Sequence, residues 1–195
     1  MENEERLQAM RDYAKKNNVP IIQDDGLNFL INLIRDNNIK TVLEIGTAIG
    51  YSAINMALNG ANVSTIERDF DYYCEAHDNV KSFGLENKIQ LIFSEAMLYN
   101  TSRQFDLLFI DGAKSQSINF FKKFRNCLHK GSFVLVDNIN FHDYTYSDKP
   151  LSRDLREMTS KIKKYVEFIQ ADNNFESKIY NIGDGLCLSR LIAEK

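Results

Sequence analysis

The chain alternates between short apolar runs rich in β-branched residues and longer amphipathic stretches, and this alternation constrains its fold most strongly. The short runs predict β-strands, because such residues suit a pleated and half-buried surface. The longer stretches predict helices; within residues 25–37, Leu27, Leu30, Ile31 and Ile34 recur at helical spacing. Strands that alternate with helices predict an α/β fold, in which a mostly parallel sheet carries helices on both faces.

The predicted elements follow one another without an evident linker, since only two prolines and nine glycines occur. Helices are predicted over residues 4–17, 25–37, 52–58 and 70–83, around 120–124 and over 153–164. Strands are predicted at Thr41–Ile45, Val63–Ile66, Ile89–Phe93, Leu107–Ile110, Phe133–Val136, Val166–Gln170, Ser177–Asn181 and Leu186–Leu191. The last two lie so close together that we expect an antiparallel hairpin at the edge of the sheet. A length of 195 residues predicts a single domain over residues 1–195, with the helices of residues 1–37 as a cap over the site.

Charge and cysteine content narrow the class of protein. The net charge of -3 lacks the strongly basic character of many nucleic-acid-binding domains, although it leaves room for a local basic patch. Cys74, Cys127 and Cys187 lie far apart, which argues against a thiolate metal site and favours a reducing compartment. The charged N-terminus does not read as a signal peptide, and no apolar run is long enough to span a membrane. We therefore expect a cytoplasmic protein without a membrane partner.

A cofactor site is predicted where the first two strands end. The first strand runs into Gly46 and Gly50, which allow a tight turn and a close approach of backbone to ligand. Their G-x-x-x-G spacing differs from the G-x-G-x-x-G pattern that places a dinucleotide pyrophosphate at a helix N-terminus. Glu67 ends the second strand, at the distance typical of an acidic residue that accepts hydrogen bonds from ribose hydroxyls. The alternative is a pair of ordinary turn glycines and a surface charge.

Oxygen-bearing side chains follow the fourth and fifth predicted strands. Asp111 ends one strand, and Asp137 with Asn138 ends the next. Two carboxylates and an amide oxygen, completed by water, suit Mg²⁺. A strand-end aspartate can also serve only as a helix cap, but the Asp-Asn pair favours a metal site.

Together these motifs resemble the metal-dependent class I O-methyltransferases, which include the catechol and caffeoyl-CoA enzymes. The resemblance covers residues 17–190 and is carried by residues 42–52, 66–69, 109–114 and 136–138. It implies a Rossmann-like class I methyltransferase fold with a mostly parallel seven-stranded sheet. It also implies S-adenosylmethionine (SAM) and Mg²⁺ as cofactors. Where related chains often have Gly-Asp and Ala, this chain has Ser94-Glu95 and Gly112, so altered adenine contacts are expected.

The resemblance also implies roles for individual residues. Glu67 would hold the ribose, Glu95 and Ala96 the adenine, and Gly46, Tyr51 and Ser52 the methionine part. The full cofactor set implied is Glu44, Gly46, Gly50, Tyr51, Ser52, Glu67, Glu95, Ala96 and Asp111. Asp111, Asp137 and Asn138 would bind the metal, and Asp111 and Lys114 form the catalytic pair. Lys114 would act as a base or steady negative charge, unless it is simply a solvated lysine.

A narrower likeness, to bacterial tRNA 5-hydroxyuridine methyltransferases, rests on residues 18–22, 44–52 and 183–186. It implies tRNA as a partner, with 5-methoxyuridine at the wobble position as product. Phosphate contacts would come from Arg153, Arg156, Lys161, Lys163 and Lys164, or from Lys122, Lys123 and Arg125, although each group can also be a solvated helix face. The aromatic residues 141–146 could stack on a substrate ring or form a packed lid, and His142 could touch the metal from outside its ligand shell.

Two alternatives remain open at this point. One is methylation of a small catechol-like phenol, which presents adjacent oxygens just as 5-hydroxyuridine does. The other is a nucleotide-binding Rossmann-like protein without catalysis, against which the three metal-ligand candidates argue. The sequence also leaves open whether the protein forms a homodimer.

Overall fold

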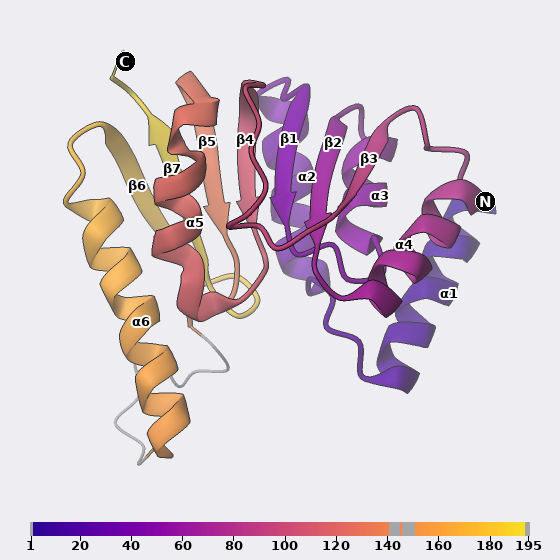
Figure 1. Cartoon of the computed structure of the whole chain (residues 1–195), viewed down its shortest axis with the longest axis horizontal. Helices are drawn as coiled ribbons and strands as arrows, with labels where there is room; N and C mark the ends of the chain where they lie inside the picture. Colours follow the sequence, from indigo (N-terminus) through magenta and orange to yellow (C-terminus); the bar gives the residue numbers. More distant parts are fainter. Residues whose placement is uncertain (1, 141–144, 146–150, 194–195) are drawn as a thin grey trace.

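The computed structural model describes residues 2–140, 145 and 151–193, and these form a seven-stranded sheet between two layers of helices (Figure 1). The helices are α1 (Glu2–Asn17), α2 (Asp24–Asp36), α3 (Tyr51–Leu58), α4 (Phe70–Ser82), α5 (Ser117–Phe124) and α6 (Arg153–Gln170), with 3₁₀ turns η1 (Lys114–Gln116) and η2 (Arg125–Cys127). The strands are β1 (Thr41–Ile45), β2 (Asn62–Glu67), β3 (Ile89–Phe93), β4 (Phe105–Ile110), β5 (Leu128–Val136), β6 (Phe175–Tyr180) and β7 (Leu186–Leu191).

The order of strands across the sheet is β3-β2-β1-β4-β5-β7-β6. The first five pair in parallel, whereas β7 runs antiparallel to β5 and pairs with the antiparallel edge strand β6. The predicted α/β class, the mostly parallel sheet and the C-terminal edge hairpin are therefore confirmed. Because β1 to β5 are parallel, their carboxyl ends meet at one edge of the sheet.

One predicted strand is wrong. Val166–Gln170 forms the last turns of α6. Its Val, Phe and Ile residues suit a strand by composition, but Ile162, Tyr165, Val166 and Ile169 continue the helical spacing of the preceding residues and are all buried. Packing of this apolar stripe against the sheet overrides the local strand preference.

Each face of the sheet buries its own apolar cluster. Helices α1, α2 and α3, with part of α4, supply one cluster, and α5 and α6 supply the other. The helix α1 lies against α4 through hydrogen bonds from Arg6 to the Ser82 carbonyl and from Tyr13 to Glu75. The proposed role of residues 1–37 as a cap over the site stays a prediction. No helix in the described part of the chain is long and apolar enough to cross a membrane.

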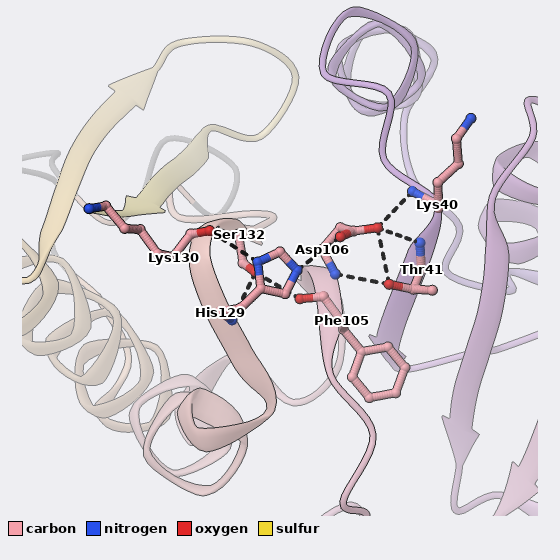
Figure 2. A network of polar contacts seen from close by, with 7 residues as sticks. All are labelled: Lys40, Thr41, Phe105, Asp106, His129, Lys130 and Ser132. Atoms are coloured by element: carbon pink, nitrogen blue, oxygen red, sulfur yellow. Dashed lines mark hydrogen bonds and ion pairs between the residues drawn. The ribbon is translucent and has the colours of Figure 1, made fainter. Parts of the chain in front are cut away.

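The amino ends of β1, β4 and β5 are joined by the carboxylate of Asp106 (Figure 2). Its Oδ2 atom accepts hydrogen bonds from the backbone nitrogens of Lys40 and Thr41 at 2.8 and 2.9 Å, and Oδ1 lies 3.0 Å from His129 Nε2. Partial burial raises the pKa of Asp106, but the hydrogen bonds outweigh it, so this pKa lies below its ordinary value. The contacts hold three strands together at the end of the sheet remote from the predicted site.

Candidate active site

The loops that leave β1, β4 and β5 stay paired beyond the strand ends. The backbone nitrogens of Gly46, Asp111 and Asp137 donate to carbonyls in the last two residues of β2, β1 and β4, at 3.0, 3.0 and 3.2 Å. The predicted cofactor and metal residues therefore start from neighbouring positions along one edge of the sheet. The structure brings the two sequence motifs into one site.

The turn between β1 and α3 depends on glycine at two places. Gly46 has φ +98° and Gly50 has φ +85°, which are backbone conformations that side chains disfavour. A Cβ atom on Gly46 would also lie 2.9 Å from the Cα atom of Gly112. The backbones after β1 and β4 thus pack against each other without room for a side chain.

Glu44 is a fully buried carboxyl group on β1. Its Oε1 atom accepts a hydrogen bond from Ser52 Oγ at 2.5 Å, and Oε2 accepts one from Thr65 Oγ1 at 2.6 Å. Burial raises the pKa of Glu44 to about 8; the two hydrogen bonds lower it, and the charges of Asp111 and Glu67 raise it further. The negative charges that act on Glu44 come from Asp111 and Glu67 at the ends of the two neighbouring strands, and these two groups favour a cationic ligand.

The raised pKa of Glu44 predicts that stability falls as pH rises. The folded protein holds this proton more tightly than the unfolded chain, so the stabilisation is complete below about pH 4.5 and is lost as the pH approaches about 8. Each pKa unit is worth about 1.4 kcal/mol, so the free energy of unfolding of the ligand-free wild type should lose a few kcal/mol over this interval relative to Glu44→Gln. Urea unfolding across the pH range measures the difference. Glu86→Gln, on an exposed glutamate, should leave the wild-type pH profile unchanged; parallel profiles for wild type and Glu44→Gln would contradict the prediction.

Glu67, the predicted ribose ligand, is 8% exposed at the end of β2. Its Oε2 atom accepts a hydrogen bond from the backbone nitrogen of Ala48 at 2.9 Å. Its Oε1 atom accepts hydrogen bonds from the backbone nitrogens of Arg68 and Asp69, each at 2.8 Å. The carboxylate is thereby fixed between the β1–α3 turn and the start of α4. A carboxylate oxygen can accept two hydrogen bonds, so Oε2 retains capacity for a hydroxyl group. The ribose role itself stays a prediction.

Tyr51 and Ser52, predicted to contact the methionine part of the cofactor, have buried side chains with partners inside the protein. Arg11 Nη1 of α1 lies 2.7 Å from the Tyr51 hydroxyl, and the Ser52 hydroxyl donates to Glu44. The contact between Arg11 and Tyr51 was not anticipated from the sequence, because no local pattern connects residues forty positions apart.

Glu95 and Ala96, the predicted adenine contacts, follow β3. Ala96 is buried, whereas Glu95 is exposed and its Oε1 lies 3.6 Å from Arg68 Nη1. The exposed rings of Phe70 and Phe93 meet edge to face beside them, with centroids 5.4 Å apart. Sequence reasoning missed this aromatic pair, although Phe93 at the end of an edge strand could have indicated it.

The predicted metal ligands follow two adjacent strands. Ile110 and Val136 are paired in register, so Asp111 and Asp137 are the next residues after neighbouring positions of β4 and β5. Asp137 is 4% exposed, and its Oδ1 atom accepts a hydrogen bond from the Asn138 backbone nitrogen at 2.6 Å. The described residues contain no group of three or more His, Cys, Asp or Glu placed to hold a metal. The predicted set holds only two carboxylates and one amide oxygen, a combination of donors that fits Mg²⁺ better than zinc.

Lys114, the predicted base, begins the 3₁₀ turn η1 after Asp111; the position of its side chain lies outside the description. The aromatic residues 141–146 and His142 also lie outside the described residues, apart from Thr145. A small pocket behind the metal candidates is lined by Ser117, Val136, Asp137, Asn138, Ile139, Ile162 and Tyr165. The buried hydroxyl of Tyr165 has no hydrogen-bond partner among the described residues.

Comparison with known proteins places the chain in a family. The family model described as O-methyltransferase matches residues 1–192. A caffeoyl-CoA O-methyltransferase of Populus kitakamiensis is 27% identical over 203 aligned positions, covering 95% of this chain and 86% of its own. Catechol O-methyltransferase B of Danio rerio is 29% identical over 169 positions, covering 77% of this chain and 62% of its own.

Solved structures agree with this placement. A caffeoyl-CoA O-methyltransferase-like protein of Staphylococcus aureus superposes with a TM-score of 0.91 at 33% identity, covering 95% of this chain and 91% of its own. An O-methyltransferase of Bacillus cereus, solved with S-adenosylhomocysteine, shares the fold with a TM-score of 0.83 at 19% identity, over 96% of this chain and 90% of its own. The chain therefore belongs to the O-methyltransferase family, and the predicted class of enzyme, a SAM-dependent O-methyltransferase, is confirmed.

Proposed function

We propose that the protein is a metal-dependent O-methyltransferase that methylates one of two adjacent oxygens on its substrate. The observation that carries this proposal is the placement of Asp111 and Asp137 at neighbouring strand ends, on the same edge of the sheet as Glu67. Such a site favours two cationic groups, the sulfonium of SAM and a divalent metal ion. A protein that only bound a nucleotide, without catalysis, would have no need of the second set of oxygen ligands.

The protein's own residues would divide the work. Glu67 would bind the ribose of SAM, and the turn at Gly46 would allow the cofactor to approach the backbone. Asp111, Asp137 and Asn138 would hold Mg²⁺, which supplies Lewis-acid stabilisation of a deprotonated hydroxyl. Lys114 would take the hydroxyl proton or steady the resulting charge. Holding the acceptor oxygen and the methyl donor in contact would provide much of the rate.

For the acceptor we propose 5-hydroxyuridine at the wobble position of tRNA. A wobble base lies in a single-stranded loop and can enter a pocket without melting a duplex. Its O5 and O4 atoms are adjacent, as in a catechol, whereas plain uridine lacks the second oxygen. This substrate would also place the protein in the cytoplasm, as its sequence predicts.

The charge distribution on the helices supports a polyanionic substrate. The layer formed by α5 and α6 carries seven basic and three acidic residues, whereas α1, α2 and α4 on the other face carry ten acidic and six basic ones. The α6 residues Arg153, Arg156, Lys161, Lys163 and Lys164 are all exposed. The first turns of α6 lie at the same end of the molecule as the carboxyl ends of the parallel strands (Figure 1). A basic helix beside the site could hold phosphates of an anticodon arm despite the negative net charge.

Methylation of a small phenol is the second candidate, and the names of the relatives favour it. The chain is similar over most of its length to caffeoyl-CoA and catechol O-methyltransferases. Both substrates named there are phenols, and a catechol presents the same pair of oxygens as 5-hydroxyuridine. The two candidates share one site chemistry and differ in whether RNA must be held.

Parallel assays with the two candidate substrates test the proposal. Purified protein with SAM and Mg²⁺ is incubated with tRNA from a strain lacking the gene, and with a simple catechol in parallel. We expect 5-methoxyuridine by nucleoside mass spectrometry of the tRNA. Because phosphate contacts release counterions, charge reversal at Arg153 and Arg156 should lower tRNA methylation by about tenfold or more.

Lys81→Glu with Lys88→Glu provides the matched control, because these exposed lysines lie at the end of α4 and just before β3, at the amino end of the sheet and away from the proposed site. This pair should leave tRNA methylation near the wild-type rate. Methylation of catechol with tRNA untouched would reject the RNA substrate and support the small-phenol candidate.

A further inference from the structure

The loop between β6 and β7 contains the motif Gly183-Asp184-Gly185. This loop pairs with the segment that follows Asp137. Ile139 N donates to the Gly185 carbonyl at 3.0 Å, and Asn140 N donates to the Asp184 carbonyl at 2.8 Å. The two backbones are therefore fixed to each other directly behind the candidate metal ligands.

Glycine is required for this close approach. Gly185 has φ +86°, and a Cβ atom there would lie 2.9 Å from Asn140 Cβ. Any side chain would push the loop away from the metal segment. The glycine thus sets the position of its neighbour, Asp184.

The Asp184 side chain contacts the amide of Asn138. Asn138 Nδ2 donates to Asp184 Oδ2 at 3.2 Å. A carboxylate only accepts hydrogen bonds, so it requires the amide nitrogen, and not the amide oxygen, to face it. The oxygen of Asn138 is then directed to the other side of the amide group.

The backbone of Asn138 is also held in an uncommon conformation. Its φ of +57° lies in the left-handed region, which asparagine tolerates better than most residues. Its backbone nitrogen donates to Asp137 Oδ1 at 2.6 Å. Both ends of the residue are thus constrained, the backbone by Asp137 and the side chain by Asp184.

We propose that Asp184 is a positioning residue that fixes the amide of Asn138 with its oxygen available to the metal. This inference rests on the metal site of the proposed function. Without Asp184 the amide can turn over, and an amide nitrogen does not ligate Mg²⁺. Groups that orient metal ligands in this way commonly change metal affinity by about 10- to 100-fold.

Metal binding by the wild-type protein is measured first, with Mn²⁺ as the probe and electron paramagnetic resonance as the readout. Absence of a bound Mn²⁺ ion would overturn the metal site, and with it the inference. Where wild type binds, Asp184→Ala should weaken the Mn²⁺ affinity by about 10-fold or more. Asp184→Asn should restore most of it, since an asparagine oxygen can still accept from Asn138 Nδ2. Equal affinity of Asp184→Ala and wild type would overturn the positioning role while leaving the metal site intact.

Two further measurements separate positioning from general damage. In an Asn138→Ala background, Asp184→Ala should cause no additional loss of Mn²⁺ affinity, because the group that it orients is absent; an undiminished loss would overturn the proposal. In the metal-free protein, the side-chain amide resonances of Asn138 should shift toward those of a solvated amide in Asp184→Ala but not in Asp184→Asn. Unchanged amide resonances in Asp184→Ala would also overturn it.

Discussion

Replacement of Asp137 by alanine is expected to reduce methyl transfer by about 100-fold or more, because the substrate oxyanion would lose its bound cation. Asp137 is the buried member of the candidate metal set, and it follows β5 next to Asp111 on β4. Removing divalent ions from the wild type with a chelator should cause a similar loss, and added Mg²⁺ should restore activity only where Asp137 is present. The rate of methyl transfer from SAM, measured at saturating cofactor, checks both effects.

The control for Asp137 must separate loss of the metal from loss of the fold. Asp106→Asn alters an aspartate of β4 at the opposite end of the sheet, where it joins strands and takes no part in the site (Figure 2). This variant should retain its dependence on Mg²⁺ and most of its activity. Calorimetry should show that Asp137→Ala still binds S-adenosylhomocysteine. Full activity of the wild type in chelator would mean that Asp111, Asp137 and Asn138 serve another purpose.

Gly46→Ala should strongly destabilise the protein and weaken cofactor binding. Two effects add at this position: the positive φ of +98°, and a Cβ atom that would lie 2.9 Å from the backbone of Gly112. The conformational strain costs about 1–2 kcal/mol, and the forced separation of the loops after β1 and β4 costs about 1–3 kcal/mol more. Urea unfolding gives the loss of stability, and calorimetric titration with S-adenosylhomocysteine gives the loss of affinity.

Gly60 offers a matched control for this substitution. It has nearly the same φ, +99°, but a Cβ atom there would meet nothing within 4 Å. Gly60→Ala should therefore carry the conformational cost alone and leave cofactor affinity unchanged. Equal losses of stability for the two variants would show that the contact between Gly46 and Gly112 does not constrain the turn.

Several elements could be predicted from sequence because their ends carry local signals. Thr41–Ile45, Ile89–Phe93 and Leu186–Leu191 form strands with the predicted bounds. The strand β5 begins at Leu128, five residues before the predicted start at Phe133. The prediction missed these residues because the segment that follows Leu128 is polar and shows no strand pattern. Its pairing with β4 through Phe105 and Leu128 is a tertiary interaction that local sequence does not encode.

The partners of the site residues were less predictable than the residues themselves. The strand-end positions of Glu67, Asp111 and Asp137 followed from the motifs. The partners of Glu44 did not, although Thr65 gave a signal as a polar residue in the apolar strand β2. Asp184 also gave one, since glycines on both sides of an aspartate mark a constrained loop.

The sequence by itself determined the α/β class, the family resemblance and the acidic and oxygen-bearing residues at the strand ends, because these depend on periodicity and motifs within short segments. The tertiary structure alone decided which of these groups meet. Burial, with a smaller effect from the charges of Asp111 and Glu67, raises the pKa of Glu44, and the Asp184 loop reaches Asn138 from forty-six residues away. Both effects depend on the order of strands in the sheet, which brings distant strand ends together and which no local pattern specifies.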